Sequence, residues 1–450
     1  MIERLNTQRT HARSGVTRPH AFRMERLKAL YDAIKDHEKL LLEALAKDLG
    51  KTTGEAYATE IGYCLSSIRF ARKHLKKWMK PRRVKTPWYM LGMRSRVHVE
   101  PVGHVLIIGP YNYPFHLVIE PLIGAIAAGN TVMVKPSEHA PATADVLKTI
   151  IDETFDAKHV SVVLGNEEVA ASLLAWRFDH VFFTGSERVG RIVYESAAHH
   201  LTPVTLELGG KSPCIVDATA NLDVAARRIA FGKWINAGQT CIAPDYLWVH
   251  ANVKDELVQK IIAAIGRFYP SMPAGYGRIV NTHHFDRLVG LVNREKLIHG
   301  FESNRDRLIF TPAIMDHVSW NDKVMQEEVF GPVLPVLTFA SIEAVVDVLK
   351  TKPSPLALYL FSADKRAQKH VLANVRYGDA CLNDTLSHVI NPHLPFGGVG
   401  ASGIGHYHGK HSFETFSHHK SIVRRTTAVD PPIAYPPWET KTKWIRKILK

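Results

Sequence analysis

The stretch His104-Val105-Leu106-Ile107-Ile108 opens an alternation of apolar runs and amphipathic segments that decides the fold. The run is short, rich in β-branched residues and followed by a loop, which is typical of a buried strand. The segment 115–128 has helical character and ends at Gly129, and the next run, Thr131-Val132-Met133-Val134, is again strand-like. This order of strand, helix and strand predicts parallel pairing, since parallel strands need a long crossover connection.

The alternation continues to residue 206. We expect further helices at 142–155, 167–176 and 189–198, and further strands at 161–164, 180–183 and 204–206. Such a chain forms a parallel sheet with helices on both faces, and ligands bind at the carboxyl ends of its strands. The loops expected at this edge begin at Gly109, Lys135, Gly165 and Gly185.

Two flanking regions complete the fold prediction. Before the alternation, residues 24–49 read as one amphipathic helix that stops at Gly50, and 55–78 read as a second helix. After it, a second alternating region from 212 to 382 has apolar runs at 214–216, 246–249 and 333–336. The predicted fold class is therefore α/β, with two doubly wound parallel-sheet domains.

The composition is that of a globular protein in a reducing compartment. The chain has 450 residues, of which 46% are apolar, and no run approaches the roughly 20 uninterrupted apolar residues of a membrane helix. The first 23 residues lack the apolar core of a signal peptide. The cysteines form neither a disulfide framework nor a CxxC zinc pair. We expect a cytoplasmic protein with no metal. The cysteines are Cys64, Cys214, Cys241 and Cys381.

The net charge of +14 needs an explanation. Basic residues gather at 72–85 and 441–450, but no helix-turn-helix, RNP or finger pattern accompanies them, so we expect no nucleic-acid partner. A solvated face that steers an anionic cofactor is the favoured interpretation. The last ten residues can form a basic helix with Trp444, Ile445, Ile448 and Leu449 on one side. Docking of that helix on a membrane surface or a partner subunit is the less favoured alternative.

Two segments carry the chemistry. Glu207 stands in Leu206-Glu207-Leu208-Gly209-Gly210-Lys211-Ser212-Pro213, and Cys241 stands in Gly238-Gln239-Thr240-Cys241-Ile242. A thiolate can add to an electrophilic carbon, and a carboxylate can then activate water. A lone Cys is more often a buried hydrophobe, and a lone Glu is more often solvated. The glycines change this balance, because they let a flat group approach the backbone and end the helix expected over 223–236.

These two segments resemble the signatures of the aldehyde dehydrogenase superfamily, and the resemblance covers about residues 15–440. Three stretches resemble its short class 3 group: Cys241-Ile242-Ala243-Pro244-Asp245-Tyr246, Glu327-Glu328-Val329-Phe330-Gly331-Pro332-Val333, and 394–420. The resemblance implies oxidation of an aldehyde to a carboxylic acid with NAD or NADP, through a thiohemiacetal and a thioester. It assigns Cys241 as the nucleophile, Glu207 as the general base, and medium-chain aliphatic or aromatic aldehydes as substrates.

Asn112 lies in Pro110-Tyr111-Asn112-Tyr113-Pro114-Phe115, directly after the first predicted strand. By itself it suits a turn. The resemblance implies that its side-chain amide donates to the oxyanion of the tetrahedral intermediate, together with the backbone N–H of Cys241. Tyr111 stands where the family commonly has Trp.

The resemblance also assigns a cofactor site. Lys135 and Glu138 are expected at the adenosine ribose, and Glu328 at the nicotinamide ribose, with Glu327 as the fallback. The glycines in 183–190 are spaced G-x-x-x-x-G rather than G-x-G-x-x-G, yet backbone N–H groups there can bind a pyrophosphate. Arg188 can add charge. The expected cofactor-binding residues are Lys135, Glu138, Gly185, Ser186, Gly190, Leu208, Gly209, Glu328 and Phe330.

The expected domain organisation follows from the same resemblance. Residues 1–84 and 101–206 form the dinucleotide-binding domain, and 207–391 form the catalytic domain. Residues 85–100 and 392–450 form a bridging and oligomerisation arm and a tail, and a homodimer is expected. The glycine-rich run 394–405 reads as a packed loop in which Phe396 lines the substrate entrance. Ala401 and His406 depart from the family pattern, and His393, His406, His408 and His411 match no metal-binding set.

Two alternative functions remain open. A coenzyme A-acylating dehydrogenase would pass the thioester to coenzyme A, but it needs no water-activating base, so Glu207 argues against it. A basic binding protein on an inactive dehydrogenase scaffold is the more distant alternative.

Overall fold

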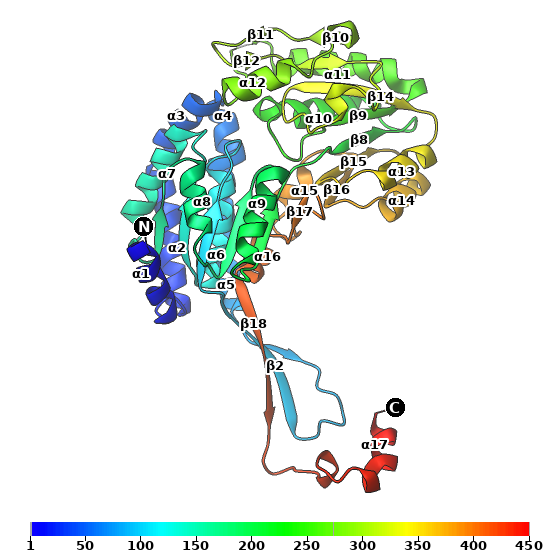
Figure 1. The fold of residues 1–450 in the computed structure, drawn as a ribbon. Coiled ribbons are helices and arrows are strands. Elements are labelled where there is room, and N and C mark those ends of the chain that lie inside the picture. Colours follow the sequence, from blue (N-terminus) through cyan, green and yellow to red (C-terminus); the bar gives the residue numbers. More distant parts are fainter. Residues whose placement is uncertain (1, 273, 450) are drawn as a thin grey trace.

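A computed structural model describes residues 2–272 and 274–449, which form two α/β lobes and a ribbon of strands that leads away to the C-terminal tail (Figure 1). Each lobe has its own largely parallel sheet. The predicted fold class is therefore confirmed: α/β with two parallel-sheet domains and a small additional element.

The first lobe contains a six-stranded sheet of order β17-β7-β6-β3-β4-β5. Its neighbours run parallel except β17, which lies antiparallel to β7 with Gly403 opposite Glu207. Val105 and Ile107 belong to one apolar core, and Leu106 and Ile108 to another, so both faces are covered. The strands are β3 (His104–Ile108), β4 (Thr131–Lys135), β5 (Val160–Val162), β6 (His180–Thr184), β7 (Val204–Glu207) and β17 (Gly403–Ile404).

The helices of this lobe correct one prediction. Residues 24–49 are two helices rather than one, because the chain turns at His37, whose ring bonds the Ala33 carbonyl at 2.9 Å. The predicted helix over 55–78 is interrupted by a π-helical segment, Tyr57–Ile61. The helices are α1 (Ile2–Arg13), α2 (His20–Asp36), α3 (Glu38–Leu49), α4 (Thr53–Ala56), α5 (Gly62–Trp78), α6 (His116–Ala128), α7 (Pro141–Thr154), α8 (Glu167–Leu174), α9 (Glu187–Ala198) and α16 (Gly409–Thr415).

The second lobe contains a seven-stranded sheet of order β10-β13-β14-β9-β8-β15-β16, and only β10 is antiparallel to its neighbour. The strands are β8 (Pro213–Val216), β9 (Tyr246–His250), β10 (Leu297–Gly300), β13 (Ala313–Met315), β14 (Val333–Phe339), β15 (Ala357–Phe361) and β16 (Asp379–Leu382). A separate ribbon joins β11 (Ser303–Asn304) to β12 (Ile309–Phe310). The helices are α10 (Leu222–Trp234), α11 (Lys254–Phe268), α12 (Thr282–Val289), α13 (Ile342–Thr351), α14 (Lys365–Asn374) and α15 (Ser387–Ile390).

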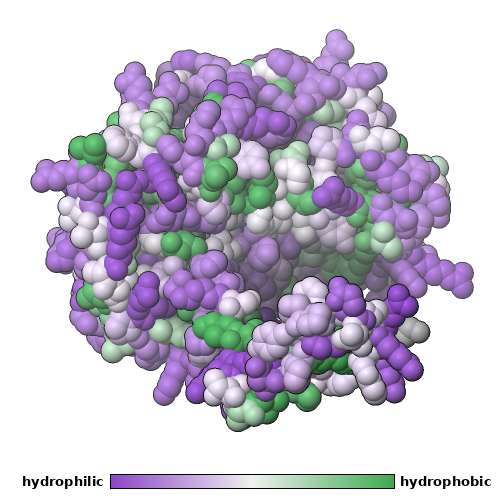
Figure 2. Space-filling view, turned by 60° about the horizontal axis from the view of Figure 1, so that its bottom comes forward, coloured by the Kyte–Doolittle hydropathy of each residue, from purple (hydrophilic) through white to green (hydrophobic). Residues whose placement is uncertain are grey.

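The arm is a three-stranded antiparallel sheet, β1 (Arg82–Val84), β2 (Met93–Pro101) and β18 (Ser417–Arg425). Most of β18 is exposed, and the arm ends in a tail that contains α17 (Thr442–Ile448). Part of 392–450 lies outside the arm, since β17 joins the first sheet. Figure 2 looks at the molecule from this end and shows a mostly hydrophilic face with separate apolar patches. Within 2–272 and 274–449, no helix is both long and apolar enough to cross a bilayer.

Candidate active site

Glu207 is the last residue of β7, at the carboxyl edge of the first sheet. Its main-chain oxygen accepts a hydrogen bond of 3.0 Å from the Gly185 N–H, which ties the ends of β6 and β7 together. Its side chain is buried, and neither carboxyl oxygen has a hydrogen-bond partner among the described residues. Burial, together with the charge of Asp379, holds the pKa of Glu207 well above its usual range.

Cys241 lies on a loop whose path is set by residues with left-handed backbone. Helix α10 ends two residues before the predicted end, and a 3-10 turn follows. The φ angles of Asn236, Ala237 and Gly238 are 54°, 53° and 74°. A Cβ on Gly238 would lie 2.2 Å from the main-chain oxygen of Gly331, so this position needs glycine. The strained turn, rather than a helix end, presents the thiol.

Hydrogen bonds of Gln239 fix this loop. Its Nε2 donates to the main-chain oxygens of Asn236 at 3.1 Å and Arg278 at 2.9 Å. Its Oε1 accepts from the Val280 N–H at 3.0 Å. The loop is therefore held from both sides before it reaches the thiol.

Asn112 comes from the first lobe, in the loop after β3. Its Nδ2 donates to the main-chain oxygen of Gln239 at 2.9 Å, and its main-chain oxygen accepts from Asn236 Nδ2 at 2.8 Å. The hydroxyls of Tyr113 and Thr240 share a hydrogen bond of 2.7 Å. The predicted amide donor is thus brought into contact with the loop that carries the thiol.

Cys241 is the one cysteine of the four with partial exposure. Burial of its sulfur raises the pKa of the thiol, and the carboxylates of Glu328 and Glu207 raise it further. The backbone N–H groups of Cys241 and Ile242 act in the opposite direction. The two predicted carboxylates therefore act on the same sulfur and help to hold the pKa of its thiol above the usual range.

A buried hub joins the three segments of the site in the second lobe. Lys211 pairs with Asp245, and its Nζ also donates to the main-chain oxygens of Val324 at 3.0 Å and Glu327 at 2.7 Å. Asp245 Oδ1 accepts from the Val329 N–H at 2.7 Å. The hub holds the segment after Glu207, the segment after Cys241 and the segment of Glu328 together.

The adjacent residues Glu327 and Glu328 differ in exposure and in their contacts. Glu327 is exposed and pairs with Arg287 at 3.0 Å. A Cβ on Gly209 would lie 2.1 Å from Glu328 Oε2, so the missing side chain makes room for that carboxyl group. Burial and the charge of Asp245 raise the pKa of Glu328 to about 8.

The remaining cofactor candidates lie at the same edge of the first sheet. Lys135, at the end of β4, is buried and pairs with Glu138. Ser186 caps α9 directly after Gly185 and accepts from the Val189 N–H at 3.4 Å. The chemistry fits a dinucleotide, because carboxylates accept ribose hydroxyls and a helix start offers free N–H groups to phosphate.

Two further candidates shape this edge. A Cβ on Gly190 would lie 2.6 Å from Leu208 Cδ2, so glycine lets α9 pack closely on that side chain. Phe330 has a φ of 43°, and its ring centroid lies 6.0 Å from that of Tyr111. Arg188 is exposed at the first turn of α9.

Several residues of this site received no role in the sequence analysis, although Lys211, Gln239 and Asp245 stand inside the quoted signature segments. Asp379 is partly exposed, and its carboxyl accepts from the Gly397 N–H at 3.2 Å. Phe396 is buried between the rings of His388 and His408, with centroids at 5.9 and 5.1 Å. The other residues missed are Lys51, Glu60, Asn236, Gln239, Lys211 and Asp245.

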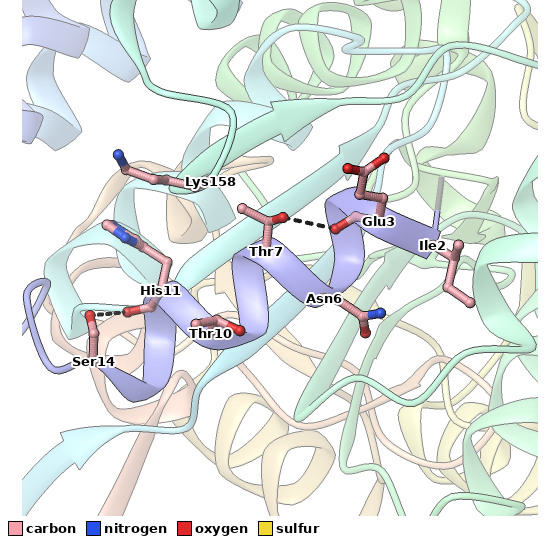
Figure 3. A pocket seen from close by; sticks show the side chains of 8 residues that line it. All are labelled: Ile2, Glu3, Asn6, Thr7, Thr10, His11, Ser14 and Lys158. Carbon is pink, nitrogen blue, oxygen red and sulfur yellow. Dashed lines mark hydrogen bonds between the residues drawn. The ribbon is translucent and has the colours of Figure 1, made fainter.

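A pocket on α1 lies away from all these groups (Figure 3). Thr7 Oγ1 donates to the Glu3 main-chain oxygen at 2.9 Å, and Ser14 Oγ donates to that of His11 at 2.7 Å. Both hydroxyls therefore donate to main-chain oxygens of α1.

A thiol, an amide donor and two carboxylates lie beside the ligand-binding edge of a parallel sheet, an arrangement that suits nucleophilic catalysis by sulfur. Comparison with known proteins identifies the class. The family model of the aldehyde dehydrogenase family matches residues 9–422. The chain belongs to this family, whose reaction is NAD(P)-dependent oxidation of an aldehyde, and the predicted enzyme class and the predicted cofactor, NAD or NADP, are confirmed.

The individual relatives support the class 3 resemblance. The chain is 50% identical to 4,4'-diaponeurosporen-aldehyde dehydrogenase of Staphylococcus aureus over 96% of each chain. It is 44% identical to the dimeric NADP-preferring aldehyde dehydrogenase of Canis lupus familiaris, over 94% of this chain and 95% of that one. A substrate-bound structure of Staphylococcus aureus AldH has a TM-score of 0.98 at 49% identity and covers 100% of both chains.

Proposed function

We propose that Cys241 is the nucleophile of this aldehyde dehydrogenase. The observation that carries the proposal is that Cys241 is the one partly exposed cysteine of the four. The charges of Glu207 and Glu328 raise the pKa of its thiol, and Asn112 contacts the loop on which it lies. Its sulfur bonds to the aldehyde carbon as the thiol proton leaves to solvent, and the carbonyl oxygen becomes an oxyanion. The Asn112 amide and the Cys241 N–H hold that oxyanion.

The second half of the reaction uses Glu207. A bound nicotinamide cofactor would supply the hydride acceptor, so that loss of hydride would leave the acyl group on Cys241 as a thioester. Glu207 then takes a proton from water, the water oxygen bonds to the acyl carbon, and the carbon–sulfur bond breaks. The carboxylic acid leaves, and sulfur regains its proton. Burial and the charge of Asp379 raise the pKa of Glu207, which makes its carboxylate a stronger base toward water.

The cofactor-binding assignments belong to the same proposal. Glu138 and Glu328 accept the two ribose diols, Lys135 lies beside Glu138, and Ser186 begins the helix that faces the pyrophosphate. The close fit of Glu328 to Gly209 supports it over Glu327. Glu138 disfavours a 2′-phosphate and Lys135 favours one, which is compatible with use of NAD or NADP. The complete set is Lys135, Glu138, Gly185, Ser186, Gly190, Leu208, Gly209, Glu328 and Phe330.

The domain roles and the partner are proposed together. Residues 1–84 and 101–206 bind the cofactor, residues 207–391 carry the nucleophile, and the arm joins two copies as a homodimer in the cytoplasm. The exposed nine-residue strand β18 at the edge of the arm supports this pairing, because an exposed edge strand is a template for another chain. The names of the relatives support an aldehyde with a large apolar part as substrate.

The test uses purified protein, a panel of aliphatic and aromatic aldehydes, and either cofactor. Reduced cofactor should form with the wild type and not with Cys241→Ala, while the variant still binds cofactor. Full activity of that variant would end the proposal. Addition of coenzyme A separates the alternative: a carboxylic acid product supports hydrolysis, and an acyl-coenzyme A product supports the acylating reaction.

A further inference from the structure

A buried ion pair lies behind the loop of Asn112. Lys51 follows α3, Glu60 belongs to the π-helical segment, and their side chains are paired with 0% exposure on both sides. Burial of two charges is an inefficient route to stability, because apolar side chains of the same size often serve as well or better. π-helical segments are rare and frequent at functional sites. The pair therefore needs a reason beyond stability.

Both partners hold the segment that follows β3. Lys51 Nζ donates to the main-chain oxygen of Asn112 at 3.1 Å and lies 4.0 Å from the ring centroid of Tyr113. Glu60 Oε2 accepts from the Phe115 N–H at 2.9 Å and the His116 N–H at 3.2 Å. The ion pair thus restrains the segment at Asn112 and again at the start of α6.

The same segment is attached on its other side to the loop of the nucleophile. Asn112 Nδ2 contacts the Gln239 carbonyl at 2.9 Å, and Tyr113 contacts Thr240 at 2.7 Å. Asn236 Nδ2 donates at 2.8 Å to the Asn112 oxygen that Lys51 also reaches. A displacement of Asn112 would therefore change its position relative to the thiol.

We propose that Lys51 and Glu60 are positioning residues, which hold the Asn112 amide at the distance from Cys241 that oxyanion binding requires. The inference rests on the proposed function, since it assumes that Asn112 binds the oxyanion. It assigns the pair to the step in which sulfur adds to the aldehyde. The adenosine side of the cofactor site, at Lys135 and Glu138, is held by a separate ion pair, so we expect the cofactor Kd to stay unchanged.

The first test is the double variant Lys51→Met and Glu60→Gln, which removes both charges and keeps an acceptor for the Phe115 N–H. The single-turnover rate of reduced-cofactor formation should fall about 100-fold, which is typical of misplacement by about 1 Å, while the cofactor Kd stays at the wild-type value. A matched control is Lys254→Met with Asp316→Asn, which removes a pair that is 14% and 11% exposed in the second lobe. The control should keep the wild-type rate even if its melting temperature falls.

A second variant, Lys51→Arg, tests the proposal even if the double variant does not fold. Lys51→Arg keeps the charge beside Glu60 but displaces the donor from the Asn112 oxygen. We expect a melting temperature near that of the wild type, a slowed single turnover, and loss of the Asn112–Gln239 contact in a crystal structure of the variant.

The outcomes separate the two proposals. Wild-type rates in Lys51→Arg and the double variant, or a crystal structure of Lys51→Arg in which Asn112 keeps its contact with Gln239, would overturn the positioning role. Absence of reduced cofactor with the wild type and the control would instead overturn the proposed function, and the crystal structure of Lys51→Arg would still decide the role of the pair.

Discussion

Asn112 donates its side-chain amide to the main-chain oxygen of Gln239, 2.9 Å away, across 127 positions of sequence. The contact joins the strand-end loop of the first lobe to the loop that carries Cys241. An Asn amide has two N–H groups, and this contact occupies one of them. We propose that the second binds the oxyanion formed when Cys241 adds to the aldehyde.

Removal of this amide should slow the chemical step. Asn112→Ala is expected to lower kcat roughly 100- to 1000-fold, because a lost oxyanion donor costs about 3 kcal/mol of barrier. Steady-state rates and the cofactor Kd, measured by fluorescence, should show the loss in kcat alone. Asn374→Ala, at an exposed position of α14, is the control and should keep the wild-type rate. Unchanged kcat in Asn112→Ala would remove the amide from the mechanism.

Glu207→Gln should separate the two halves of the reaction. The thioester still forms, but water is not activated, so we expect a burst of one equivalent of reduced cofactor followed by slow turnover. Rapid-mixing absorbance at the wavelength of reduced cofactor measures the burst. If the first equivalent of reduced cofactor forms slowly, Glu207 acts in a step that precedes thioester formation. That result would contradict its assignment as the base for hydrolysis.

Asp379 should set the pH dependence of hydrolysis. Its charge raises the pKa of Glu207, so Asp379→Asn should lower that pKa and move the rise of kcat to lower pH. The pKa of Asp379 is itself raised to about 6 by burial. The wild type and the variant should therefore differ above pH 6, where Asp379 is ionised and Glu207 is still titrating. The two profiles should converge below pH 6 and again where Glu207 is ionised in both proteins. Identical pH profiles above that value would exclude the coupling.

Gly238→Ala should unfold the thiol loop. The added Cβ would meet the Gly331 oxygen at 2.2 Å, and the φ of 74° disfavours a side chain. We expect a loss of about 1–3 kcal/mol in the free energy of unfolding, together with loss of activity. Gly266→Ala in α11 is the matched control, since its Cβ would meet nothing within 4 Å. Denaturant titration of both variants tests the difference, and equal stability of the two would contradict it.

Gly209→Ala should weaken cofactor binding. Its Cβ would lie 2.1 Å from Glu328 Oε2 and would displace the carboxyl group proposed for the nicotinamide ribose. An increase of about tenfold in the cofactor Kd corresponds to about 1.4 kcal/mol. Calorimetric titration with NAD and NADP measures it. If the variant binds the cofactor with wild-type affinity although Glu328 is displaced, Glu328 does not bind the nicotinamide ribose.

The elements best predicted from sequence are those with a strong local pattern. The strand at 104–108 lies where the apolar run predicts it. The helix ends before Gly129, as predicted, because Gly129 adopts the left-handed φ of 92° that ends a helix. The break at His37 was missed, since it depends on a side chain that bonds the helix carbonyl. The π-helical segment around Glu60 has no local sequence signal, and Glu60 within it makes tertiary contacts with Lys51 and with the Phe115 N–H.

The residues of the site also fall into those with a local sequence signal and those without one. Glu207 and Cys241 stand in glycine-rich segments whose local chemistry is readable without a fold. Lys51, Glu60 and Asp379 stand in segments with no such signal. Each acts through a group far away in sequence: Lys51 reaches an oxygen 61 positions later, and Asp379 acts on the carboxyl of Glu207.

By itself the amino-acid sequence determined the α/β class and most of the order of strands and helices, because these are encoded in short-range periodicity. Two local segments, read together with the family resemblance, made Cys241 and Glu207 the candidates for the nucleophile and the base. Only the tertiary structure decided which groups surround that thiol. The distance from Asn112 to Gln239 and the raised pKa of Glu207 arise from the packing of the two lobes and from loss of water around buried charges. Neither property belongs to any single segment of the chain.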